Sequence, residues 1–125
     1  MSKLEVYPIT FRIDGVGIVE GELYRVKAPQ SVENIWYALP ISCRVRVQDN
    51  NQAHFLIDTQ NKAEHPTFNI EPGDITYQPM SKAIIVFWEK AKPYVEVNII
   101  GKITKNIDLF KTMRNLSRVV IEKQK

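Results

Sequence analysis

One eight-residue stretch decides the fold: Ile41-Ser42-Cys43-Arg44-Val45-Arg46-Val47-Gln48 alternates apolar and polar residues without a break. Successive side chains of a strand point to opposite faces, so this period of two predicts a strand with one buried and one solvated face. The buried face would hold Ile41, Cys43, Val45 and Val47. The solvated face therefore carries two arginines, Arg44 and Arg46.

The residues that follow predict a hairpin. Asp49-Asn50-Asn51 is a turn sequence, and residues 53–58 form a returning strand with Phe55 and Ile57 on one face. Because the two strands of a hairpin keep their apolar side chains on one face, the alternate residues of both strands lie on the opposite face. We call four of them the arginine face and predict that they bind ligand: Arg44, Arg46, His54 and Leu56. Alternating polar residues also occur on the solvated side of any sheet, and a bulge would break this parity.

Similar patterns predict further strands on both sides of this hairpin. They cover residues 4–13, 16–23, 75–77, 83–88, 95–103 and 119–121, with Asp14-Gly15 as a turn and Gly101 as a bend. The run at 83–88 is continuously apolar and rich in β-branched residues, which is typical of a strand buried on both faces.

Two short helices are predicted. In the first, Ser31 is the expected N-cap and Pro40 the stop. Its apolar positions share one helical face: Val32, Ile35, Trp36 and Leu39. In the second, Asn106 is the expected cap of residues 107–110.

These elements define a mainly β fold of about eight strands with one or two short capping helices. A closed barrel leaves no exposed sheet edge, so we predict a closed eight-stranded barrel, with an open sandwich as the second choice. The length of 125 residues suits a single domain over residues 1–125.

Charge and composition narrow the function classes. The formal net charge is +3, but residues 1–100 carry a net −2 and residues 101–125 a net +5. This basic segment lacks interleaved exposed aromatic residues and a recognisable binding module, so nucleic-acid binding is not expected. No apolar stretch approaches the roughly 20 residues of a membrane span, and the N-terminus lacks the apolar core of a secretory signal. The lone Cys43 fits a reducing cytoplasm.

No motif for metal or cofactor chemistry stands out. Gly15 and Gly17 fit a hairpin turn rather than a phosphate-binding loop. His54 and His65 are separated in sequence, and no carboxylates lie at ligand spacing, so no metal site and no cofactor are expected. Cys43 belongs to the apolar face and His54 to the opposite one, which argues against a Cys–His dyad.

Two passages carry a resemblance to known proteins. Residues 28–39, followed by Ser42-Cys43-Arg44-Val45-Arg46-Val47, resemble the cyclophilin element P-x-T-x-x-N-F-x-x-L and its F-H-R-[IV]. Residues 73–84 and 97–103 are similar to G-D-[IV]-x-Y-x-P-x-x-x-A and V-N-x-[IV]-G-[RK]-[IV]. Those patterns belong to a small uncharacterised family of cyclophilin-like proteins from archaea and thermophilic bacteria, and the likeness covers essentially the whole chain.

The resemblance implies a closed barrel of about eight strands capped by short helices. In true cyclophilins the arginine of F-H-R lies on an outer barrel face and donates to the twisting prolyl amide, and Arg46 matches it by position. The cyclophilin segments Q-G-G-D-F and N-G-S-Q-F-F-I are missing, because this chain has Gln52-Ala53-His54-Phe55 and Ala83-Ile84-Ile85-Val86.

We therefore expect a non-enzymatic binding or interaction domain for a peptide or a small anionic ligand. The ligand would lie on the arginine face or at a barrel mouth rimmed by the loop of residues 59–72. The alternative is a residual peptidyl-prolyl cis-trans isomerase with Arg46 as its catalytic residue. The sequence leaves a homo-oligomer open, because exposed barrel faces can pair.

Overall fold

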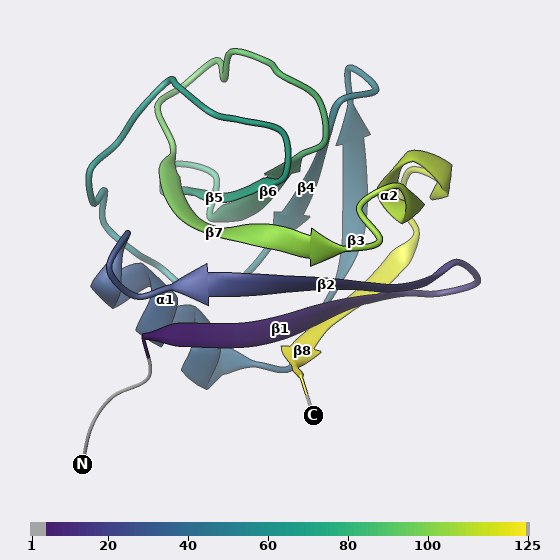
Figure 1. Ribbon diagram of the computed structural model, residues 1–125, viewed down its shortest axis with the longest axis horizontal. Helices are drawn as coiled ribbons and strands as arrows, with labels where there is room; N and C mark the ends of the chain where they lie inside the picture. The colour runs from purple at the N-terminus through teal and green to yellow at the C-terminus, as the bar shows by residue number, and fades with distance from the viewer. Residues whose placement is uncertain (1–4, 125) are drawn as a thin grey trace.

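The chain forms a closed antiparallel barrel of eight strands in the order β1-β2-β7-β5-β6-β4-β3-β8 (Figure 1). The computed structural model describes residues 5–124. The strands are β1 (Val6–Ile13), β2 (Gly17–Tyr24), β3 (Ile41–Gln48), β4 (Gln52–Leu56), β5 (Asp74–Gln78), β6 (Ala83–Phe87), β7 (Asn98–Lys105) and β8 (Arg118–Lys123). The helices are α1 (Pro29–Ala38) and α2 (Leu109–Thr112). The prediction of a closed barrel is confirmed. Leu4, the expected start of the first strand, and Lys125, the end of the basic segment, lie outside the described residues.

The barrel interior is filled by alternate residues of every strand and contains a cluster of aromatic rings. The ring centroid of Phe11 on β1 lies 5.3 Å from that of Phe55 on β4 and 5.6 Å from that of Phe110 on α2. Trp88 stacks on Phe110 at 6.3 Å. Because α2 places Phe110 in this cluster, the short helix is held by burial of an aromatic side chain.

Strand β6 is buried on both faces, as its apolar sequence predicts. Ile84 and Val86 belong to the barrel core. The alternate residues Ala83, Ile85 and Phe87 form a second apolar cluster with Ile70 and Val97. Residues 57–73 and 88–97 are the two long loops beside β5 and β6, in teal and green (Figure 1). These loops therefore cover the outer face of β6.

Helix α1 begins earlier than predicted, and Ser31 is not its N-cap. Ala28 occupies that position and Pro29 is the first helical residue. The free N–H groups are instead satisfied by Glu64 from the first long loop, whose carboxylate accepts from Gln30 N at 3.2 Å and Ser31 N at 2.8 Å. The Ser31 hydroxyl also donates to Glu64, at 2.9 Å. A residue distant in sequence thus provides the cap.

Other boundaries also differ from the sequence-based expectations, among them the starts of β7 and α2. Strand β7 starts at Asn98 rather than at residue 95, because Val97 pairs with Thr67 of the neighbouring loop in an isolated bridge. Asn106 does not cap α2 with its side chain, which donates to the Ile18 carbonyl at 3.1 Å, and Asp108 occupies the N-cap position.

Candidate functional site

The arginine face is built by the β3–β4 hairpin. Val45 pairs with Phe55 and Arg46 with His54, and both Val45 and Phe55 are fully buried in the barrel. Their neighbours therefore point away from the core. Arg44, Arg46 and Leu56 are exposed, and His54 is half-buried. The structure thus brings the four predicted residues to the outer wall formed by β3 and β4.

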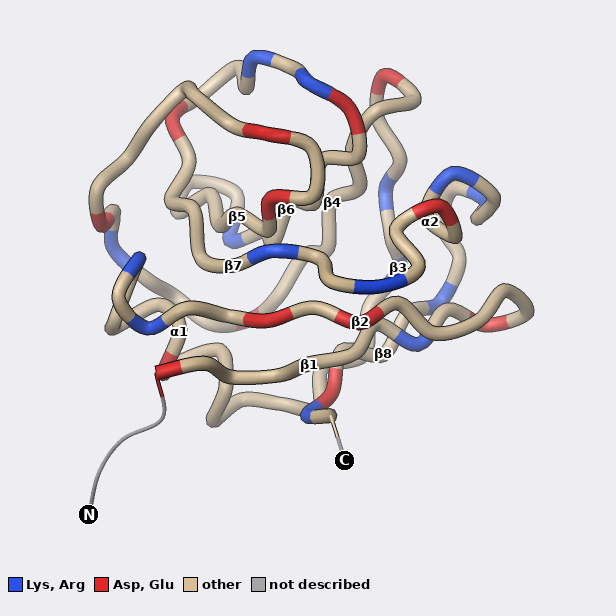
Figure 2. The backbone as a smooth tube through the Cα atoms, in the orientation of Figure 1, with Lys and Arg blue, Asp and Glu red and all other residues tan. Residues whose placement is uncertain are grey.

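The positive charge of this face is not neutralised by acidic neighbours. Arg44 Nη1 donates to the Leu116 carbonyl at 3.3 Å, and no ion pair within residues 5–124 involves Arg44 or Arg46. Arg118 of β8 is the cross-strand partner of Arg44, and its Nε donates to Ser42 Oγ at 3.2 Å. Figure 2 shows blue stretches of Lys or Arg on β3 and β8. Facing like charges weaken a sheet, but neither guanidinium group is paired with a carboxylate within residues 5–124, so each keeps further N–H donors for an anion.

A shallow depression of about 310 Å³ adjoins Arg46. It is lined by Arg46, Val47, Gln48, Asn115 and Leu116. Asn115 Oδ1 accepts from Val47 N at 2.9 Å, and Leu116 N donates to the Val45 carbonyl at 2.7 Å, so the segment before β8 is fixed against β3. Of the four predicted residues, only Arg46 lines this depression. Asn115 and Leu116 were not predicted, because only the closing of the barrel brings them to β3.

His54 takes part in a local hydrogen-bond chain. Gln52 Nε2 donates to Asn51 Oδ1 at 2.8 Å, which leaves Gln52 Oε1 to accept from His54 Nε2, also at 2.8 Å. Burial lowers the pKa of His54 below its ordinary value of 6.5, although the charge of Asp49 acts in the opposite direction. The neutral imidazole is therefore the form that the folded protein favours.

The lowered pKa of His54 predicts a pH-dependent stability. His54 is harder to protonate in the folded protein than in the unfolded chain. Its contribution to the free energy of unfolding is therefore fully present above pH 6.5 and is lost as the pH falls through the lowered pKa. Urea unfolding at pH 7.5 and pH 5.5 should show a larger loss for the native chain than for His54→Gln, which keeps the exposed His65. Equal losses of unfolding free energy in the two proteins would show that His54 does not cause the pH dependence.

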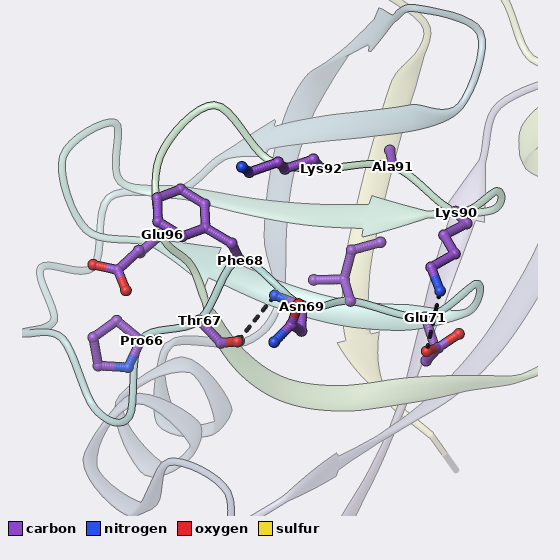
Figure 3. A pocket seen from close by; sticks show the side chains of 10 residues that line it. Pro66, Thr67, Phe68, Asn69, Glu71, Lys90, Ala91, Lys92 and Glu96 are labelled. Carbon is purple, nitrogen blue, oxygen red and sulfur yellow. Dashed lines mark hydrogen bonds and ion pairs between the residues drawn. The ribbon is translucent and has the colours of Figure 1, made fainter.

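A cavity of about 880 Å³ lies between the two long loops (Figure 3). We call it the loop cavity. Its lining consists of residues 66–71 from the first loop and Lys90, Ala91, Lys92 and Glu96 from the second. The second of the two sites expected from the sequence is a barrel mouth rimmed by the loop of residues 59–72, and the loop cavity includes part of this loop. The buried Ile70 packs with the outward residues of β6, so the loop cavity itself lies on the outer wall.

Both signs of charge occur around the loop cavity. Lys90 Nζ lies 4.0 Å from Glu71 Oε1, and Lys92 Nζ lies 5.5 Å from the centroid of the Phe68 ring. Figure 3 shows Glu96 on the same side of the cavity as Phe68. Balanced charges and an exposed aromatic ring favour a ligand with both polar and apolar parts.

Other chemistries have less support in the geometry. Cys43 is half-buried against the core, and burial raises the pKa of its thiol to about 11. A thiol with a raised pKa is a poor nucleophile. Among residues 5–124, no group of three His, Cys, Asp or Glu side chains could hold a metal ion. No helix in this range is long and apolar enough to cross a membrane.

Comparisons with known proteins agree with the barrel. The hypothetical protein AF2241 from Archaeoglobus fulgidus has a TM-score of 0.84 at 26% sequence identity, over 98% of each chain. McbB, solved in complex with tryptophan, has a TM-score of 0.75 at 14% identity, over 93% of this chain and 44% of its own, and shows the fold alone. No curated protein matches the chain. Residues 8–122 match the Cyclophilin-like family, and the chain belongs to that family.

Proposed function

We propose that this chain is a non-enzymatic binding protein whose arginine face takes the carboxylate or phosphate group of a small anion or a peptide. The observation that carries the proposal is Arg46, which is exposed beside a depression and has no ion-pair partner within residues 5–124. A guanidinium group offers two parallel N–H donors that match the geometry of these anions.

The neighbouring groups would complete such a contact. Arg44 and Arg118 add positive charge across the β3–β8 pair. The exposed Leu116 provides an apolar surface at the depression. The single cysteine and the missing membrane-spanning helix within residues 5–124 are compatible with the cytoplasm, where we place this binding.

Arg46→Gln tests the site. We expect saturable amide shifts at Asn115 and Leu116 when the protein is titrated with inorganic phosphate or with an N-acetylated tripeptide that has a free C-terminal carboxylate. Loss of one charge-assisted bidentate contact lowers affinity about tenfold. NMR titration of the native chain and the variant measures this change.

Arg12→Gln is the matched control. Arg12 also lies on the outer surface of the barrel, but its Nε is engaged by Glu122 Oε1 at 3.0 Å. We expect its replacement to leave anion affinity within a factor of two. The proposal fails if phosphate and the peptide produce no saturable shifts, or if Arg46→Gln and Arg12→Gln have the same effect.

A residual peptidyl-prolyl isomerase is the second candidate, and the exposure of Arg46 at the matching barrel position favours it. Rotation about an X–Pro bond breaks amide resonance, and a donor aimed at the prolyl nitrogen would stabilise the twisted state. Exchange spectroscopy on a blocked proline tetrapeptide should then show faster cis–trans exchange that Arg46→Ala abolishes. No acceleration at equimolar protein would exclude this activity.

A further inference from the structure

The two loops that bound the loop cavity begin as a β-ladder that is not continued. Thr67 N donates to the Val97 carbonyl at 2.9 Å, and Val97 N donates to the Thr67 carbonyl at 3.0 Å. The next donor on the first loop, Asn69 N, is taken by Thr67 Oγ1 at 3.0 Å (Figure 3). A local side-chain bond of this kind competes with strand pairing, so the ladder ends after one pair and the loops separate.

Beyond this point the loops leave backbone donors unused. Within residues 5–124, the N–H groups of Phe68 and Ile70 donate no hydrogen bond, and neither do those of residues 89–96, where Pro93 has none to donate. Most backbone N–H groups of folded proteins are paired with protein or with water. Here the open groups belong to the two chain segments that face each other across the loop cavity.

The walls of the cavity are anchored. Ile70 is 3% exposed and belongs to the apolar cluster over β6, and Ala91 packs against the same cluster. The volume of about 880 Å³ lies within the usual range of about 300–1,000 Å³ for ligand sites. The lining carries Lys90 and Lys92 against Glu71 and Glu96. Balanced charges of this kind do not select an anion or a cation.

We propose that the loop cavity binds an extended peptide segment of a partner protein, which pairs with the open backbone groups of Phe68, Ile70 and residues 90–92. This is strand addition, in which main-chain hydrogen bonds supply affinity and side-chain pockets supply specificity. The exposed Phe68 ring provides an apolar contact for one peptide side chain. The site is separate from the arginine face and does not depend on anion binding.

The probes are blocked pentapeptides, acetyl-Thr-Val-Xaa-Val-Thr-amide, with Glu, Ser or Lys as Xaa. We expect at least one of them to shift the amide resonances of Phe68, Ile70 and residues 90–92, and to slow their hydrogen exchange. The matched control is the same peptide with N-methyl groups on its two valines, which removes two backbone donors. It should bind at least tenfold more weakly, because side chains alone would not supply the pairing.

Two protein variants complete the test. Ala91→Trp fills the cavity and should weaken binding at least tenfold, whereas Met80→Trp adds the same side chain at an exposed position outside the lining and should not. Arg12→Gln should leave binding unchanged, because Arg12 is engaged by Glu122 and does not line the loop cavity. If Ala91→Trp fails to fold, the comparison of the pentapeptide with its N-methylated form on the native chain still tests the proposal. Equal binding of the methylated peptide, or no shifts at millimolar concentration, would overturn the proposal.

Discussion

Gly101→Ala is expected to lower the free energy of unfolding by more than about 3 kcal/mol. A Cβ at this position would lie 2.0 Å from the Glu22 carbonyl oxygen and 2.9 Å from Leu23 Cα. Both atoms belong to the backbone of β2, which pairs with β7 at this point. The strands would have to separate to admit a methyl group, and the barrel would lose hydrogen bonds on that seam. Urea unfolding of the two proteins measures the loss.

Gly21→Ala is the control for this prediction. Gly21 lies on β2 in the same ladder, but its closest neighbours are the terminal methyl groups of Ile75 at 3.0 Å and Ile103 at 3.3 Å, with the Lys102 carbonyl at 3.2 Å. Flexible side-chain ends can move by a few tenths of an ångström, so we expect a loss of about 1 kcal/mol. Equal losses for Gly101→Ala and Gly21→Ala would mean that the close approach of the β2 backbone is not decisive.

The barrel could be predicted because its signals are local. Alternation at residues 41–48 predicts which side chains of β3 enter the core, and the same pattern places Val45 and Phe55 on one face, where the structure pairs them. The apolar run of β6 predicted burial on both faces. It did not indicate what covers the outer face, because Ile70 and Val97 come from loops without periodicity.

The candidate sites were less predictable for the same physical reason. Parity placed Arg46 and His54 on one wall, but Asn115 and Leu116 reach the depression only through the pairing of β8 with β3. The loop cavity lies between two irregular segments that are joined by one bridge, between Thr67 and Val97. Contacts between irregular segments distant in sequence leave no local pattern from which to predict them.

The cap of α1 is another such long-range contact, and Ser31 illustrates the error. A serine near the start of an apolar helical stripe is a good N-cap candidate. Ser31, however, is the third residue of α1 rather than its N-cap, and its side chain is fully buried. Its hydroxyl donates to Glu64 instead of accepting from the helix backbone. The N–H and hydroxyl donors belong to the helix itself, but their acceptor, the Glu64 carboxylate, belongs to a distant loop. The local sequence pattern of the helix does not indicate where that loop lies.

Glu64→Ala is expected to lower the free energy of unfolding by about 2 kcal/mol, because charge-assisted hydrogen bonds each contribute about 1.5–3 kcal/mol and water replaces part of that loss. The carboxylate receives three hydrogen bonds, from Gln30 N, Ser31 N and Ser31 Oγ. Its removal leaves the first turn of α1 without a cap and the buried Ser31 hydroxyl without its acceptor. Chemical denaturation of the native and variant proteins measures the difference.

Glu71→Ala is the matched control, because its carboxylate is largely exposed and lies 4.0 Å from Lys90 Nζ. An exposed pair of this kind contributes less than about 1 kcal/mol, so this variant should be nearly as stable as the native chain. Glu64→Gln keeps an acceptor oxygen and should recover part of the loss. A Glu64→Ala variant as stable as Glu71→Ala would contradict the capping role.

The same contact links helix α1 to the walls of the loop cavity. Glu64 lies two residues before Pro66, the first residue of the lining, and its own N–H donates to Asn98 Oδ1 at 2.9 Å. The carboxylate bonds the loop to α1, and the backbone bonds it to β7. In Glu64→Ala we therefore expect faster hydrogen exchange at residues 67–70, while the amides of β3 and β4 remain protected. Equally faster exchange in all these segments would indicate global destabilisation rather than release of this loop.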